Sequence, residues 1–196
     1  ELTAGERIGV HRYRFPAGKP AHVLIDLRTS MYDYPGKVLW SRLRLRENGT
    51  LTGFRETRGW APARQLYFAV RFSKPLSGHA LHSTEQDILY KGFAPPAVDD
   101  PVARAQIEGR ALVGVVDFPA DTSELIVKVS ISAVSEENAI ANLDAEMPGW
   151  DFDAVRTAAH NAWRDALSVF EVDASEPMRK SFYTAVYHTL MAPSLF

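Results

Sequence analysis

The chain has 196 residues, and its 22 lysines and arginines are nearly balanced by 24 aspartates and glutamates. This balance argues against a surface for nucleic acid or another polyanion, which would need a basic patch. The absence of cysteine excludes disulfides, thiolate nucleophiles and zinc–thiolate sites. No apolar run reaches the roughly 18 residues of a transmembrane helix, so we expect no membrane span.

Residues 1–134 have the pattern of a β-domain. Apolar and polar residues alternate in short, β-branched runs, and turn signals separate these runs. This arrangement favours an antiparallel sandwich over a parallel α/β sheet. We therefore predict a supersandwich-like β-sandwich domain over residues 1–134. The predicted strands are residues 22–27, 40–46, 51–56, 65–72, 111–118 and 124–132.

A tight hairpin turn is predicted between the second and third of these strands. Asn48 and Gly49 are the residue types that supply the positive φ angles of such a turn. Together with Thr50 they also form a glycosylation sequon, although the turn is a sufficient explanation. The strand before the turn alternates arginine with leucine over residues 42–46, which predicts that the arginines lie on a solvated face.

The pattern becomes helical near Ser135. A capping serine followed by acidic residues is a typical helix start, because both suit the positive end of the helix dipole. Pro148 and Gly149 end this helix, and Asp151 begins a second one whose apolar residues recur at spacings of three and four. We predict a helical linker over residues 135–173.

A third helix is predicted to begin at Ser175, with Pro177 in its first turn, and to end before Pro193. Apolar residues cover most of its circumference, and such a helix is normally buried among other helices. We therefore expect residues 174–196 to begin an all-helical domain of a larger protein. Its main stripe comprises Met178, Phe182, Ala185, Val186, Thr189 and Leu190, widened by Tyr183 and Tyr187.

The sequence contains no motif that is typical of a catalytic site or a metal site. The paired carboxylates at residues 99–100 read as loop residues, and Asp151 and Asp153 read as helix-start acids. His79 and His82 are three residues apart near an expected loop, which could bring two ligands together. They have no third ligand nearby, so we predict no metal site.

Trp60 and Arg58 are the sugar-contact candidates. Trp60 lies in a loop close to Pro62, where an indole can stack on a sugar ring, and Arg58 could donate hydrogen bonds to hydroxyl groups. Alternatively, the Trp60 side chain is buried at one end of the sandwich core. The usual burial of tryptophan favours this alternative.

Residues 182–189, followed by residues 192–193 and 195–196, closely resemble the start of the helical domain in glycoside hydrolase family 92, the calcium-dependent exo-acting α-mannosidases. Other segments agree in the same order. Residues 11–15 resemble the family's segment leading into an inner strand, and residues 67–75 resemble one of its strands. Positions between 128 and 146 resemble its crossover into helices, and residues 150–153 resemble the start of its linker helix.

The resemblance implies a β-sandwich packed on an (α/α)6 toroid, with residues 174–196 as the first toroid helix and the active site between the domains. The implied reaction is inverting hydrolysis of terminal α-linked mannose on mannose-containing glycans, with α-1,2 as the expected linkage. Inversion needs two carboxyl groups roughly 6.5–9.5 Å apart. Calcium would bind sugar hydroxyls. The family resemblance also implies a periplasmic or secreted protein.

The resemblance transfers no catalytic or calcium residue to this chain. The family's acid and base motifs correspond to positions beyond Phe196, and its glycine-rich sugar-binding loops correspond to positions before Glu1. We therefore expect the chain to be an N-terminal fragment that is inactive by itself.

Two alternatives to a mannosidase fragment remain open. A non-catalytic carbohydrate-binding module would fit the sandwich but not the unfinished apolar helix. A sandwich-plus-toroid phosphorylase acting on disaccharides would share the architecture, but residues 182–189 argue against it. The exposed stripe, including Phe182, Val186 and Leu190, could also cause self-association through residues 175–196.

Overall fold

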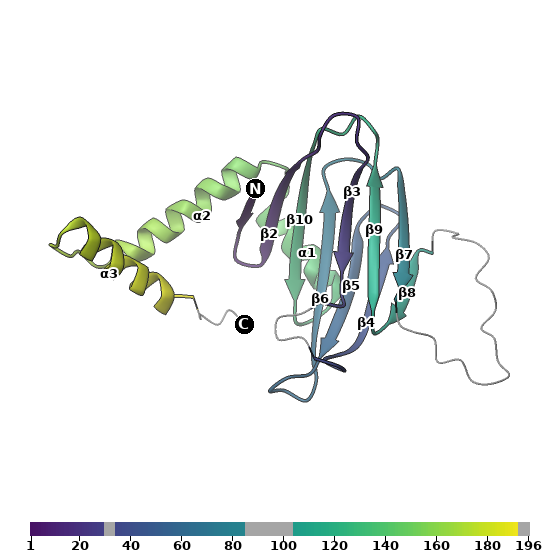
Figure 1. Ribbon diagram of the computed structural model, residues 1–196, viewed down its shortest axis with the longest axis horizontal. Coiled ribbons are helices and arrows are strands. Elements are labelled where there is room, and N and C mark those ends of the chain that lie inside the picture. The colour runs from purple at the N-terminus through teal and green to yellow at the C-terminus, as the bar shows by residue number, and fades with distance from the viewer. Residues whose placement is uncertain (30–33, 85–103, 192–196) are drawn as a thin grey trace. The chain divides into compact units, whose positions relative to one another are not determined.

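The computed structural model describes residues 1–29, 34–84 and 104–191, which form two compact units, Glu1–Phe152 and Asp153–Phe196 (Figure 1). The strands are β1 (Leu2–Ala4), β2 (Ile8–Arg14), β3 (Ala21–Asp26), β4 (Val38–Leu45), β5 (Leu51–Thr57), β6 (Arg64–Phe72), β7 (Gly78–Ser83), β8 (Gln106–Gly109), β9 (Leu112–Phe118) and β10 (Glu124–Ser132). The helices are α1 (Glu136–Glu146), α2 (Phe152–Leu167) and α3 (Glu176–Thr189).

The first unit contains two antiparallel sheets, as predicted. One has seven strands in the order β1-β2-β10-β6-β5-β4-β8, and the other has three in the order β3-β9-β7. All six predicted strands are confirmed, with ends that shift by no more than two residues. Four further strands, β1, β2, β7 and β8, are not among those predicted. Three of these are edge strands, and each edge strand takes its register from a single neighbour.

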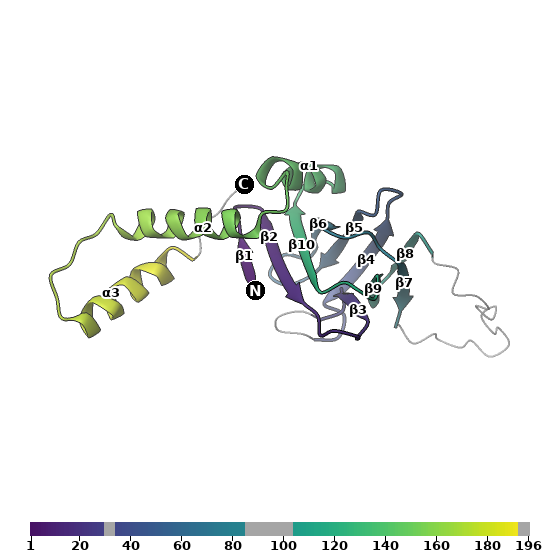
Figure 2. The same ribbon diagram turned by 90° about the horizontal axis from the view of Figure 1, so that it is seen from above.

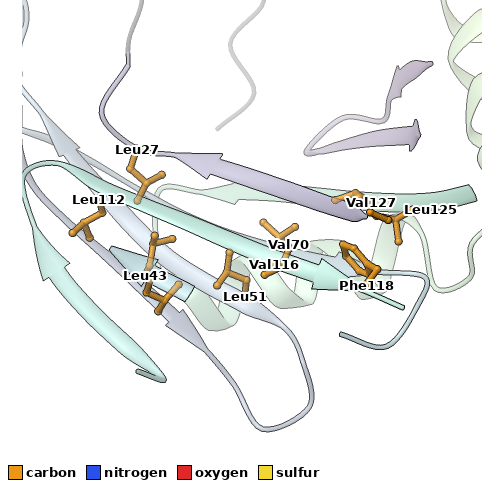
Figure 3. Packing of buried hydrophobic residues seen from close by; sticks show 11 residues of the cluster. Leu27, Leu43, Leu51, Val70, Leu112, Val116, Phe118, Leu125 and Val127 are labelled. Atoms are coloured by element: carbon orange, nitrogen blue, oxygen red, sulfur yellow. The ribbon is translucent and has the colours of Figure 1, made fainter. Parts of the chain in front are cut away.

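The core lies between the two sheets (Figure 3). Alternation along each strand sends one row of apolar side chains into this space. On β10, for example, Leu125 and Val127 are buried in the core, whereas Lys128 points to the opposite face. Full burial of each such side chain contributes about 1.5–3 kcal/mol. The core residues are Ala21, Leu27, Leu43, Leu51, Val70, Leu81, Leu112, Val116, Phe118, Leu125 and Val127.

The hairpin between β4 and β5 is confirmed. Gly49 has a φ angle of 76°, and the Thr50 N–H donates to the side-chain oxygen of Asn48 over 3.1 Å. A second glycine is needed where the two strands approach closely. A Cβ at Gly53 would lie 1.9 Å from the carbonyl oxygen of Arg42, so any larger residue there would push β4 and β5 apart.

The first helix begins and ends as predicted. The Ser135 hydroxyl accepts the N–H of Asn138 over 3.0 Å, and α1 ends at Glu146, before Pro148. This helix covers the outer face of the seven-stranded sheet, against β10 and β6, so the first unit has three layers (Figure 2). The other helix starts are also confirmed, since α2 and α3 begin one residue after Asp151 and Ser175.

The second unit pairs α2 with α3 through aromatic side chains. The ring centroids of Trp163 and Tyr187 are 4.7 Å apart, and the Tyr183 hydroxyl donates to the carbonyl oxygen of Phe170 over 2.8 Å. No residue of α3 is buried, and Met178 is 67% exposed. None of the described helices is long and apolar enough to cross a membrane.

Candidate functional site

Polar side chains on the outer face of β10 hold the helix through which the chain leaves the sandwich. The Ser132 hydroxyl donates to the side-chain oxygen of Asn138 over 2.9 Å, in the first turn of α1. Two residues earlier on the strand, the Ser130 hydroxyl donates to the carbonyl oxygen of Ala139 over 2.5 Å. The two-residue period of the strand therefore presents a polar row to α1 on the face opposite the core.

Lys128 extends this row to the end of the helix. Its buried ammonium donates to the carbonyl oxygens of Met147, over 2.5 Å, and Gly149, over 3.2 Å. It also lies 4.4 Å from the ring centroid of Trp150. Burial lowers the pKa of Lys128, but the two carbonyls and the indole face partly replace its water shell.

Glu136 holds the start of the helix. Its carboxylate accepts hydrogen bonds from Arg42 (2.5 and 3.0 Å), Arg46 (3.2 Å) and the Thr52 hydroxyl (2.6 Å). Burial alone would raise the pKa of Glu136, but the hydrogen bonds from Thr52 and Arg42 outweigh burial and lower it. The prediction of a solvated arginine face is wrong for Arg42 and Arg46, because the first turn of α1 covers their guanidinium groups.

Two more acidic residues of α1 contact the sandwich near the other end of the helix. Asp144 forms an ion pair with Arg71 of β6, and a hydrogen bond from that guanidinium lowers the pKa of Asp144. Glu146 accepts the backbone N–H of Arg7 over 3.0 and 3.2 Å. The helix is thus held at both ends by charged groups as well as by its buried face.

These carboxyl groups suit a structural role. Among the described residues, every carboxyl group with a clearly shifted pKa has it lowered, namely Glu1, Asp26, Glu136, Glu137 and Asp144. A general acid in glycoside hydrolysis needs the opposite shift, because it must carry a proton near neutral pH.

The structure places Trp60 and Arg58 together on the turn between β5 and β6. Trp60 is fully exposed, at 108%, so it does not plug an end of the sandwich. The Arg58 backbone N–H donates to the carbonyl oxygen of Lys37 over 3.0 Å, and its own carbonyl accepts the Tyr34 hydroxyl over 2.9 Å. The turn therefore presents an open indole next to an exposed guanidinium.

The two candidate histidines lie on a strand and not in a loop. On β7, His79 is paired with Val116 and His82 with Val113. An odd spacing along a strand places side chains on opposite faces, so these two imidazoles cannot bind one ion. In the part of the chain that the structure describes, no group of three or more His, Asp or Glu side chains could hold a metal. Residues 99–100 lie outside the described residues.

Sequence models of two domains match the chain. The Glycosyl hydrolase family 92 N-terminal domain matches residues 1–132, and the Glycosyl hydrolase family 92 catalytic domain matches residues 138–196. A protein from Arthroderma benhamiae described as an uncharacterized secreted glycosidase is 32% identical over 71 residues, which are 34% of this chain and 9% of that protein.

The structure is also similar to solved enzymes. A family GH92 α-mannosidase from Bacteroides thetaiotaomicron matches 100% of this chain with a TM-score of 0.82 and 29% identity. Its complex with mannoimidazole matches with a TM-score of 0.81 and the same identity. The chain covers 25% and 24% of those two chains, so it spans about a quarter of the enzyme's length.

Proposed function

The chain belongs to glycosyl hydrolase family 92, and from this we propose that it is part of an enzyme that removes terminal α-linked mannose from glycans. The proposal rests on the structural similarity of the whole chain to a GH92 α-mannosidase. That enzyme's complex with mannoimidazole supports a mannose-shaped substrate. The match to a catalytic domain over residues 138–196 disfavours a purely non-catalytic carbohydrate-binding module.

The proposed reaction is inverting hydrolysis of α-1,2-linked mannose. One carboxylic acid would protonate the leaving oxygen while a carboxylate activates water across the sugar ring. The resemblance to the family is the basis for this mechanism. The lowered pKa values of the carboxyl groups that hold α1 support a division of labour in which these groups position helices and take no part in proton transfer.

Within such an enzyme, we assign this chain the sandwich and its connection to the helices. The polar contacts around Glu136 and Lys128 would fix where the helical part begins relative to the sheet. On the β5–β6 turn, Trp60 would stack on a sugar ring and Arg58 would donate to its hydroxyls. The complete exposure of the indole supports this role.

Calcium is part of the proposal for the whole enzyme. The described residues offer no cluster of carboxylates for the ion, so they do not fit a calcium site and we assign no ligand here. We also propose that the protein is periplasmic or secreted, which the similarity to a secreted glycosidase supports.

The test is release of mannose from α-1,2-mannobiose. A protein extended at both ends to the length of the solved relatives should release mannose and lose this activity with a calcium chelator. The 196-residue chain should release none. Activity of the 196-residue chain would contradict its assignment as a non-catalytic part. An inactive extended protein that is folded would contradict the substrate.

A further inference from the structure

A hollow of about 410 Å³ lies at one end of the sandwich, next to Trp150. Its walls come from the β6–β7 turn, with Lys74, and from the β9–β10 turn, with Asp121 and Ser123. A second hollow of about 310 Å³ has Trp150 and Lys74 in its wall as well, together with the β4–β5 turn. Because they share these side chains, the two hollows are neighbours. Both volumes are at the lower end of the range for ligand sites, about 300–1,000 Å³.

Trp150 is held in place beside these hollows. The Lys128 ammonium lies 4.4 Å from its ring centroid, and the same ammonium donates to the carbonyl oxygen of Gly149, the residue before Trp150. The indole nevertheless remains 36% exposed. A large aromatic surface that is fixed before binding loses little conformational entropy when a ligand contacts it.

Apolar side chains such as Pro75, Ile126 and Leu76 form part of the walls, and the charged side chains balance one another. Lys74 and Arg71 contribute two positive charges, and Asp121 and Glu124 contribute two negative charges. Ser123 adds a hydroxyl group. This set contains donors and acceptors without a dominant charge, which suits a neutral polyhydroxylated molecule better than an anion or a purely apolar ligand.

The strand register separates this site from Trp60. Leu51 is paired with Val70 at one end of the β5–β6 hairpin, and Thr57 is paired with Arg64 at the other. The β5–β6 turn with Trp60 follows Thr57, whereas both hollows adjoin the turn that follows Phe72. The nine residues of β6 span roughly 30 Å, so a single disaccharide cannot contact both tryptophans.

We propose that the Trp150 hollows form a binding site for a neutral oligosaccharide. This inference rests on the proposed function in that it takes the oligosaccharide to be a non-reacting part of the glycan substrate. One sugar unit stacks on the indole, and the next lies in the neighbouring hollow. Lys74, Asp121 and Ser123 hydrogen-bond to the hydroxyl groups.

The experiment is a calorimetric titration of the 196-residue chain with α-1,2-mannobiose. We expect saturable binding that Trp150→Ala weakens by at least tenfold. Because Trp150 also contacts Lys128, that variant could perturb the fold. Lys74→Ala and Asp121→Ala change exposed residues and should each weaken binding about threefold to tenfold without changing the circular dichroism spectrum.

Trp40→Ala is the matched control, because Trp40 is a 40% exposed tryptophan of the sandwich that lines neither hollow. Unchanged affinity in Trp40→Ala with loss in the hollow variants supports the site. Unchanged affinity in the hollow variants, or no binding by the unmodified chain, overturns it. Mannose release by the extended protein is a separate readout. Binding here without release there would contradict the proposed function alone, and release without binding would contradict the Trp150 site alone.

Discussion

At the scale of single residues, the buried carboxylate of Glu136 joins segments far apart in the chain. It is 94 positions from Arg42 and 84 positions from Thr52, and it accepts hydrogen bonds from both. A buried charge is favourable only when partners replace its water shell. Here two guanidinium groups and one hydroxyl do so, which makes Glu136 the most connected carboxylate that holds α1 to the sheet.

We expect Glu136→Gln to lower the free energy of unfolding by about 2–4 kcal/mol, because it leaves Arg42 and Arg46 without their shared charge. Urea unfolding at pH 7 measures the loss. Glu137→Gln is the control, since Glu137 contacts the same Arg46 but its side chain is 72% exposed. It should cost less than about 1 kcal/mol. Equal losses in the two variants would contradict a special role for the buried carboxylate.

The same residue predicts a pH dependence. The pKa of Glu136 is lower in the folded protein than in the unfolded chain, where it is about 4.3. The unfolded state therefore binds more protons in this range, and stability falls as the pH drops below about 4.3 toward the folded pKa. Urea midpoints measured between pH 7 and pH 3 should fall less steeply for Glu136→Gln than for the unmodified chain. Parallel curves would refute this prediction.

At the scale of elements, α1 is attached to the sheet by a small apolar face as well as by its charged ends. Ala139 and Leu143 are both fully buried. We expect Leu143→Ala to reduce the free energy of unfolding by about 2–4 kcal/mol, through lost burial and a residual cavity. Ala141→Gly, on the exposed side of the same helix, tests helix propensity alone and should cost about 1 kcal/mol. If Leu143→Ala cost no more than this control, packing would not hold α1 in place.

At the scale of the whole molecule, the family match and the packing divide the chain at different places. The catalytic-domain match begins at residue 138, inside α1, whereas the first compact unit continues to Phe152. The helix in which the catalytic-domain match begins, α1, therefore packs on the sandwich and belongs to the first compact unit. The expected boundaries at residues 134 and 173 stay a prediction, and limited proteolysis of the linker would test them.

The exposed face of α3 offers a surface for self-association. We propose that the 196-residue chain self-associates through residues 175–196, because Met178 is 67% exposed and Leu190 is 38% exposed. The double variant Met178→Lys/Leu190→Lys should shift the mass measured by light scattering toward the monomer. Ser181→Lys, which adds a charge at an exposed polar position of the same helix, should leave it unchanged. A monomeric unmodified chain at high concentration would contradict the proposal.

Local signals were sufficient for much of the fold. The cap at Ser135, the turn at Gly49, the proline after α1 and the alternation in six strands each depend on residues within a few positions of one another. Two of the edge strands were missed because β1 has only three residues and β8 only four, too few for a clear period. The resemblance of residues 182–189 pointed to the family, which the matches over most of the chain confirm.

The sequence by itself determined the sandwich, the helix starts and the family, because short-range periodicity and motifs carry that information. Only the tertiary structure decided which side chains meet across the layers. The first turn of α1 covers Arg42 and Arg46, Trp60 is open to solvent, and Trp150 contacts Lys128 beside two hollows. These contacts join segments 19 to 94 positions apart. Alternation shows which face of a strand a residue occupies, but only packing shows what lies against that face.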